Sequence, residues 1–111
     1  MVKKPKPSKY KNIKTSINGT SFDSKGEAQR YGALLLMQKD GIIKDLKRQV
    51  KHPIVINNQK ICTLIVDYVY TDIKTGNVIL EDFKGMKETP IFRIKAKLVK
   101  AVYGLDIKIT R

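Results

Sequence analysis

Residues 61–84 have the sequence ICTLIVDYVYTDIKTGNVILEDFK, and this segment decides the fold. β-Branched and aromatic residues dominate 61–70 and 78–84, a composition typical of strands. A polar stretch from Asp72 to Asn77, with Gly76 near its end, separates the two and indicates a turn. The segment therefore predicts a β-hairpin whose strands run antiparallel.

A capping box begins the first predicted helix on the amino-terminal side of this hairpin. Ser24 and Glu27 stand three residues apart, apolar residues at helical spacing follow them, and Gly41 offers a natural stop. Between this helix and the hairpin, residues 42–56 alternate apolar with charged side chains or form short β-branched runs. That pattern predicts short strands.

A second helix is predicted on the carboxyl-terminal side of the hairpin. Thr89-Pro90 supplies a cap and a first-turn proline, and Gly104 ends the helix. Residues 105–110 alternate as a final strand. The order α-β-β-β-α-β predicts an α/β domain with a central sheet flanked by helices. The buried stripe of the second helix is expected to comprise Ile91, Ile94, Leu98 and Val102.

The large positive net charge of the chain indicates a polyanionic partner. The chain has 111 residues, enough for one compact domain, and its 23 Lys+Arg against 10 Asp+Glu give a formal net charge of +13. Residues 1–16 contain lysines but no acid and are expected to form a flexible basic arm, either a solubilising tail or a nucleic-acid contact through Lys3, Lys4 and Lys6. Residues 17–111 are expected to form the single domain.

The sequence predicts a cytoplasmic protein with no membrane partner. Its apolar runs are far shorter than the roughly 20 residues of a membrane-spanning helix. The basic amino terminus lacks the apolar stretch of a secretion signal, and Cys62 is the only cysteine.

Acidic residues inside the apolar strands are the candidate functional groups. Asp67 interrupts one strand, and Asp82 shares a face of the next strand with Lys84, because side chains alternate across a strand. By the same alternation Glu81 and Phe83 face the other way. Two carboxylates facing each other across a ladder at about 5 Å repel by roughly 3 kcal/mol unless a cation lies between them.

Oxygen ligands of this kind suit Mg²⁺ or Mn²⁺, whereas a single histidine and a single cysteine argue against zinc. Two alternatives stay open at this point. Asp67 is equally well explained by bonds to backbone amides or an arginine, and the Asp82–Lys84 pair by an ordinary surface salt bridge.

Glu27 on the first helix, Asp67, and Asp82-Phe83-Lys84 together resemble the PD-(D/E)XK nuclease superfamily. More narrowly, residues 24–31, 67–70 and 81–85 resemble a family of small phage-encoded proteins placed in that superfamily, and the resemblance covers about residues 10 to 111. It implies a restriction-endonuclease-like core in which Asp67, Asp82, Glu27 and the main-chain carbonyl of Phe83 bind the metal and Lys84 assists the hydrolytic water.

Two positions depart from that pattern, and one member has a second explanation. Val66 stands where the motif has a proline, and Glu81 competes with Asp82, although only Asp82 shares a face with Lys84. Glu27 is also explained by the capping box alone.

The expected function is a metal-dependent endodeoxyribonuclease that hydrolyses DNA phosphodiester bonds with Mg²⁺ or Mn²⁺. The resemblance extends this to phage DNA recombination or replication, including Holliday-junction cleavage by a homodimer. The alternative is a non-catalytic DNA- or RNA-binding accessory protein. The side chains expected to contact DNA phosphates, besides the amino-terminal lysines, are Arg93, Lys95, Lys97 and Lys100, with snorkelling to the helix edge as the alternative for Lys95. Gln49 was a further candidate for contact with the site.

Overall fold

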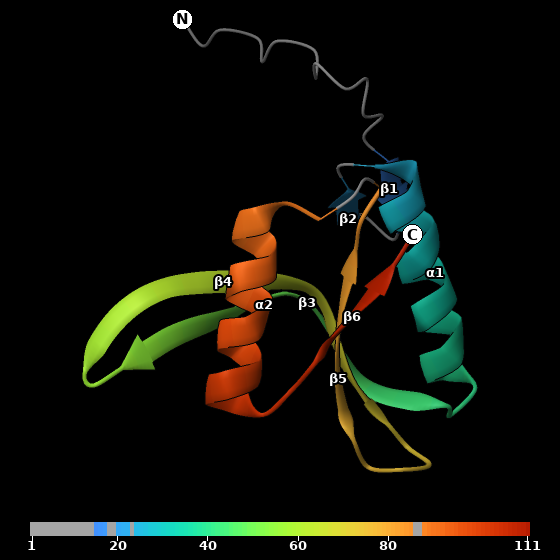
Figure 1. The fold of residues 1–111 in the computed structure, drawn as a ribbon. Coiled ribbons are helices and arrows are strands. Elements are labelled where there is room, and N and C mark those ends of the chain that lie inside the picture. The colour runs from blue at the N-terminus through green and yellow to red at the C-terminus, as the bar shows by residue number, and fades with distance from the viewer. Residues whose placement is uncertain (1–14, 18–19, 23, 86–87) are drawn as a thin grey trace, which may run out of the picture.

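The computed structural model describes residues 15–17, 20–22, 24–85 and 88–111, so the predicted roles of Lys3, Lys4 and Lys6 lie outside the described residues. Two helices and six strands follow one another along the chain (Figure 1). Their bounds are β1 Thr15–Ile17, β2 Thr20–Phe22, α1 Lys25–Lys39, β3 Ile43–Ile56, β4 Gln59–Asp72, β5 Val78–Phe83, α2 Pro90–Tyr103 and β6 Ile107–Thr110.

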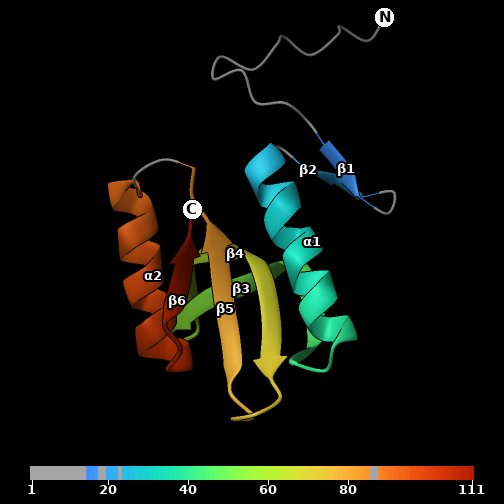
Figure 2. The same ribbon diagram turned by 90° about the vertical axis from the view of Figure 1, so that its right-hand side faces the viewer.

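A four-stranded mixed sheet in the order β3-β4-β5-β6 forms the centre of the fold. The β3–β4 and β4–β5 pairs are antiparallel, and β6 runs parallel to β5. The helices lie on opposite sides of this sheet (Figure 2). The predicted α/β class and the order from α1 to β6 are therefore confirmed, and a separate antiparallel pair, β1 and β2, precedes them. β1 begins within the stretch assigned to the basic arm.

One long hairpin replaces the short strands predicted over 42–56. β3 and β4 are each 14 residues long and are joined at Asn57 and Asn58, whose φ angles are 50° and 64°. Positive φ at both central residues is the geometry of the tight turn that matches the twist of antiparallel strands, and asparagine tolerates it better than most residues. The prediction of separate strands was wrong because a bulge between Lys44 and Lys47 lets β3 continue through its irregular stretch.

Both predicted helix starts are confirmed. The Ser24 Oγ accepts the N–H of Glu27 at 3.1 Å, and the Thr89 Oγ1 accepts the N–H of Phe92 at 3.1 Å, so each cap satisfies one of the free amides of the first turn. At the other end of α2, Gly104 adopts φ 71° and donates its N–H to the carbonyl of Lys100.

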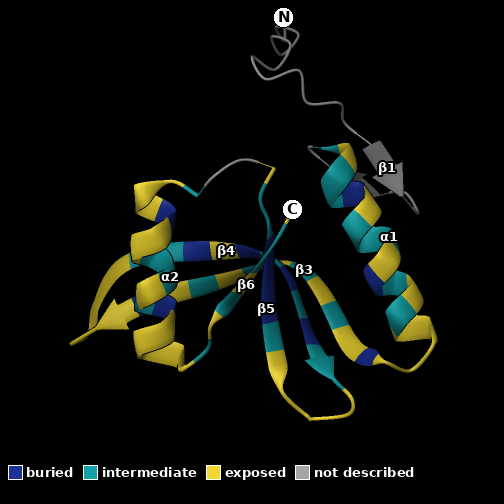
Figure 3. Cartoon of the chain, turned by 45° about the vertical axis from the view of Figure 1, so that its right-hand side comes forward, coloured by how far each residue is buried: buried dark blue, intermediate teal, exposed yellow. Residues whose placement is uncertain are grey.

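The buried side of α2 differs from the prediction. Phe92 and Val99 are buried against the sheet, and the half-buried Ala96 and Leu98 pack beside them. Ile91, Ile94 and Val102 are exposed, the first two by 67% and 60%. Figure 3 shows this outer side of the helix as exposed. The prediction was wrong for Ile91, Ile94 and Val102, because α2 carries two apolar stripes at helical spacing and periodicity does not tell which one faces the sheet.

A buried ion pair ties α1 to β5. The carboxylate of Glu81 is fully buried and receives two hydrogen bonds from Arg30, at 2.6 and 2.7 Å, and one from the Tyr70 hydroxyl at 2.6 Å. Burial alone would raise the pKa of Glu81, but these hydrogen bonds outweigh it and lower that pKa. Glu81 therefore has a structural partner on the α1 side of the sheet.

We predict that Glu81→Gln lowers the free energy of unfolding by about 3 kcal/mol, because the substitution leaves the partly buried Arg30 charge without its partner. Urea denaturation measures the loss. Glu88→Gln is the matched control, since Glu88 pairs with Arg111 near the surface. Equal losses from the two substitutions would contradict this role for Glu81.

Candidate functional site

The candidate site lies where β4 separates from β5. The ladder between these strands runs from Thr71↔Val78 to Tyr68↔Glu81, so the next position would set Asp67 opposite Asp82. At this position the two carboxylates, instead of main-chain carbonyls, accept hydrogen bonds from main-chain N–H groups. The N–H of Asp67 donates to Oδ1 of Asp82 at 3.0 Å, and the N–H of Phe83 donates to Oδ2 of Asp67 at 3.0 Å. The predicted meeting of the two carboxylates is thus present in the structure.

The alternation of side chains along β4 breaks at Asp67. Leu64 and Val66 belong to the cluster under α2, whereas Tyr68 and Tyr70 belong to the cluster under α1. Regular alternation would put all four on one face. The strand therefore rotates at Asp67, which turns this carboxylate toward the end of β5.

Gln49 on β3 supports Asp67 from the other side. Its Nε2 donates to Oδ1 of Asp67 at 3.0 Å, and its backbone has a φ of 52°, in the left-handed region. The sequence offered Gln49 only as one residue that could touch the site. The structure brings it into direct contact with Asp67.

Lys84 lies over the same site. Its Nζ is 2.8 Å from Oδ2 of Asp82 and 4.0 Å from the centre of the Phe92 ring at the start of α2. Asp82 is only 4% exposed, and Lys84 is half-buried. The predicted sharing of one face by Asp82 and Lys84, with Glu81 on the other, is confirmed.

Glu27 approaches from the first turn of α1. Its Oε1 lies 3.7 Å from the guanidinium of Arg48, and its main-chain carbonyl accepts the Tyr68 hydroxyl at 2.6 Å. Arg48, which no sequence pattern singled out, also lies 5.4 Å from the centre of the Tyr31 ring. Its position in the charged run of β3 gave no signal that set it apart from neighbouring lysines.

These acids form an electrostatic cluster. Burial, followed by the negative charge of Asp82, raises the pKa of Asp67 to about 7, and the charge of Glu27 adds to the same effect. The hydrogen bond from the N–H of Phe83 opposes this shift without cancelling it. Asp67 therefore sits where a further positive charge is favourable.

The donors are hard oxygens, which suit Mg²⁺ or Mn²⁺. Within residues 15–17, 20–22, 24–85 and 88–111, however, no three carboxylate, imidazole or thiol side chains come together in a group that could hold a metal ion. Asp67 and Asp82 are adjacent, and Glu27 contacts Arg48 instead. The ligand role predicted for the Phe83 carbonyl stays a prediction.

The basic residues of α2 have different surroundings. Lys95 donates from its Nζ to the carbonyl of Thr63 on β4 at 3.3 Å, and Lys100 forms an ion pair with Asp106 at 2.8 Å. Arg93 and Lys97 are exposed along α2. Phosphate contact by these four side chains stays a prediction. In the part of the chain that the structure describes, neither helix has the length and apolar character needed to span a membrane.

The fold and site together define an α/β domain with a mixed four-stranded sheet and a paired-aspartate site beside a lysine. Residues 7–111 match the model of the family described as "Protein of unknown function (DUF1064)", and the chain belongs to this family. Neither the curated proteins nor the solved structures gave a match.

We predict that the melting temperature of Asp67→Asn, taken relative to that of the wild type, increases as the pH rises from about 5 to about 8 in a chelator-containing buffer. The folded state favours the protonated form of Asp67, so the contribution of this group to stability is lost as the pH rises through its pKa of about 7. Thermal unfolding of both proteins over this range measures the difference. A difference in melting temperature that stays constant with pH would contradict the pKa shift.

Proposed function

We propose that this protein is a metal-dependent endodeoxyribonuclease that hydrolyses DNA phosphodiester bonds. The observation that carries the proposal is the convergence of Asp67, Asp82 and Lys84 at the point where β4 separates from β5. Two carboxylates with adjacent N–H donors and one ammonium group form a compact polar site beside strands that are otherwise apolar.

A divalent cation fits the chemistry of these donors. Burial and, after it, the negative charge of Asp82 raise the pKa of Asp67, and bound Mg²⁺ or Mn²⁺ would offset the repulsion between the two carboxylates. Asp67 and Asp82 would hold the ion, and the resemblance adds Glu27 and the Phe83 carbonyl. Glu27 would have to turn from Arg48 for this role. When bound, such an ion supplies Lewis-acid stabilisation of a phosphate and lowers the pKa of a coordinated water.

Lys84 would stabilise negative charge on the scissile phosphate. Its contact with the Phe92 ring and its bond to Asp82 hold the ammonium beside the carboxylates instead of in bulk solvent. Gln49, through its bond to Asp67, would keep that carboxylate oriented toward the end of β5. The exposed Arg93 and Lys97 would contribute sequence-independent contacts to the DNA backbone.

The finer parts of the proposal rest on the resemblance to PD-(D/E)XK nucleases. These are a restriction-endonuclease-like fold, a role in phage recombination or replication, and cleavage of branched DNA by a homodimer. The observed element order and mixed sheet support the first of them. The others stay predictions.

We predict that the purified protein nicks plasmid or branched DNA with Mg²⁺ or Mn²⁺, and that Asp82→Asn or Lys84→Met lowers the rate by about 100-fold or more. Asp72→Asn is the matched control and should retain activity, because Asp72 lies on the same strand as Asp67 but its side chain accepts the N–H of Lys74 in the β4–β5 turn. A gel assay on linear, flapped and four-way substrates measures these rates. If the wild type gives no metal-dependent cleavage, the protein is a non-catalytic nucleic-acid-binding protein instead. If Asp82→Asn cleaves as well as the control, the cleavage does not take place at this site.

A separate measurement tests the metal alone. We predict that Mn²⁺ raises the melting temperature of the native protein and of Asp72→Asn, but not of Asp67→Ala, because an ion bound only to the folded site stabilises it by linkage. An equal rise in melting temperature in all three proteins would mean that Mn²⁺ binds at a site other than Asp67.

A further inference from the structure

The outer edge of β6 is open in the part of the chain that the structure describes. β6 is the last strand of the sheet and pairs only with β5 there. The carbonyl of Thr110 points to β5, because it accepts the N–H of Lys84. Backbone groups of alternate residues point to opposite sides of a strand, so those of Ile107 and Ile109 point outward. An open edge of this kind is a template for another strand.

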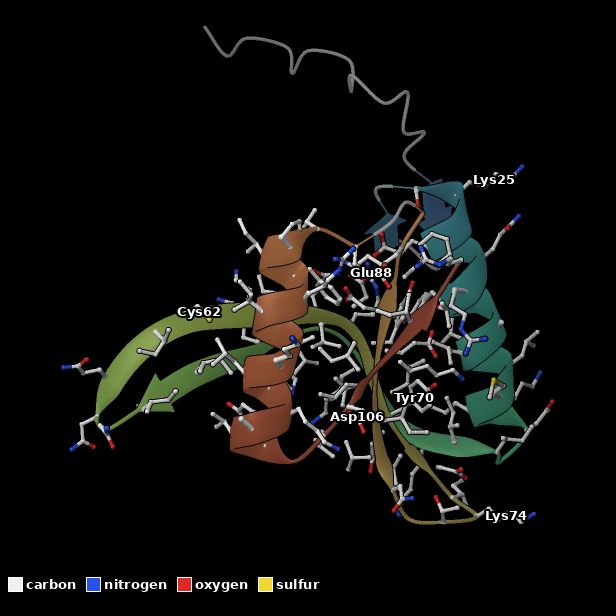
Figure 4. The ribbon with its side chains drawn as sticks, viewed as in Figure 1. Lys25, Cys62, Tyr70, Lys74, Glu88 and Asp106 are labelled. Carbon is white, nitrogen blue, oxygen red and sulfur yellow. The ribbon has the colours of Figure 1, made fainter. Side chains whose placement is uncertain are left out.

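A groove follows this edge on the α2 side. A cavity of about 370 Å³ lies between α2 and β6, with apolar walls from Phe92, Ala96, Ile107 and Ile109. A second cavity of about 270 Å³ shares Ala96 and Ile107 with the first and continues to Asp106. Glu88 and Asp106, labelled in Figure 4, lie toward opposite ends of α2. The groove therefore runs along most of the helix.

A third cavity lies on the other side of the sheet, beside the end of the same strand. It has a volume of about 330 Å³ and is bounded by α1, by Phe83, and by Thr110 and Arg111. Side chains of a strand alternate between the two faces of a sheet. A strand added to β6 would therefore direct successive side chains into the α2 groove and toward this cavity.

The charged residues beside the α2 groove indicate which kind of partner would bind there. Arg93, Lys97 and Lys100 border the α2 groove, and the two acids beside them, Glu88 and Asp106, are already paired with Arg111 and Lys100. The basic residues 1–16 and a second copy with its net charge of +13 would both be repelled. The phosphates of a nucleic acid would match the charge of these basic residues, but they carry no apolar group that could contact the walls of the groove.

We propose that the open edge of β6 is a docking site for an extended acidic segment of another protein. The segment adds as a strand, bonds to the outward backbone groups of Ile107 and Ile109, and places apolar side chains on Ala96 and Phe92. Its carboxylates pair with Arg93 and Lys97. This inference does not depend on the proposed nuclease activity, and a bound segment would compete with DNA for Arg93 and Lys97.

The probe is a short fluorescein-labelled peptide, Asp-Asp-Ile-Asp-Ile-Asp-Asp, with a Lys-for-Asp version as the control. Fluorescence anisotropy should give a Kd below about 100 μM for the acidic peptide, with affinity falling as salt rises. The lysine peptide should not bind. No binding of the acidic peptide at 1 mM, or equal binding of both, overturns the proposal.

Matched charge reversals locate the contact. Lys97→Glu should weaken peptide binding by about tenfold, whereas Lys39→Glu, on the exposed end of α1, should change it less than about twofold. Asp82→Asn should leave it unchanged, which separates this test from that of the nuclease proposal. Equal effects of the two lysine reversals overturn the proposal.

Amide hydrogen exchange distinguishes strand addition from other contacts. The peptide should slow exchange at Ile107 and Ile109, whose N–H groups point outward, and leave Lys108 and Thr110 unchanged. If raising the protein concentration alone protects Ile107 and Ile109, the edge pairs with a second copy and the proposal fails. It also fails if duplex DNA displaces the peptide and neither complex protects these amides, because the groove then belongs to nucleic acid.

Discussion

The carboxylates of Asp67 and Asp82 lie side by side because main-chain amides hold them there. Where the two strands separate, the Asp67 carboxylate accepts the N–H of Phe83 and the Asp82 carboxylate accepts the N–H of Asp67. These bonds replace the hydrogen bonds of the β4–β5 ladder. Hydrogen bonds of this charge-assisted kind stabilise the buried Asp82 and the half-buried Asp67, which would otherwise repel each other. These hydrogen bonds do not cancel the effects of burial and repulsion, since the pKa of Asp67 still rises to about 7. The local structure therefore concentrates negative charge at a fixed place in the sheet.

The two faces of β5 place its adjacent acids in different surroundings. Glu81 turns to α1 and accepts hydrogen bonds from Arg30, Tyr70 and Thr110, whereas Asp82 turns to the side of Lys84 and Phe92. Adjacent acids in one strand thus have different partners for a purely geometric reason. The rotation of β4 at Asp67 gives the second carboxylate access to the Asp82 side.

Local patterns predicted the parts of this arrangement that depend on local physics. The turn at Asp72–Asn77 predicted the β4–β5 hairpin, the alternation in residues 80–84 separated Asp82 from Glu81, and the caps at Ser24 and Thr89 predicted both helix starts. Features set by tertiary contacts were not accessible in this way. The outer apolar stripe of α2 was mistaken for the buried one, and no local pattern indicated the contact of Arg48 with Glu27. Gln49 was a candidate for the site, but its bond to Asp67 depends on the irregular backbone of β3, where Gln49 has a φ of 52°.

We propose that Asp67 and Asp82 together form a site for a divalent cation, and anomalous scattering from crystals of the protein soaked in MnCl₂ would locate such an ion. We expect a manganese peak at roughly 2.0–2.2 Å from oxygens of both carboxylates, close to the metal–oxygen distances of hard octahedral cations. A map with no peak between these residues, or with manganese bound only elsewhere on the chain, would contradict it.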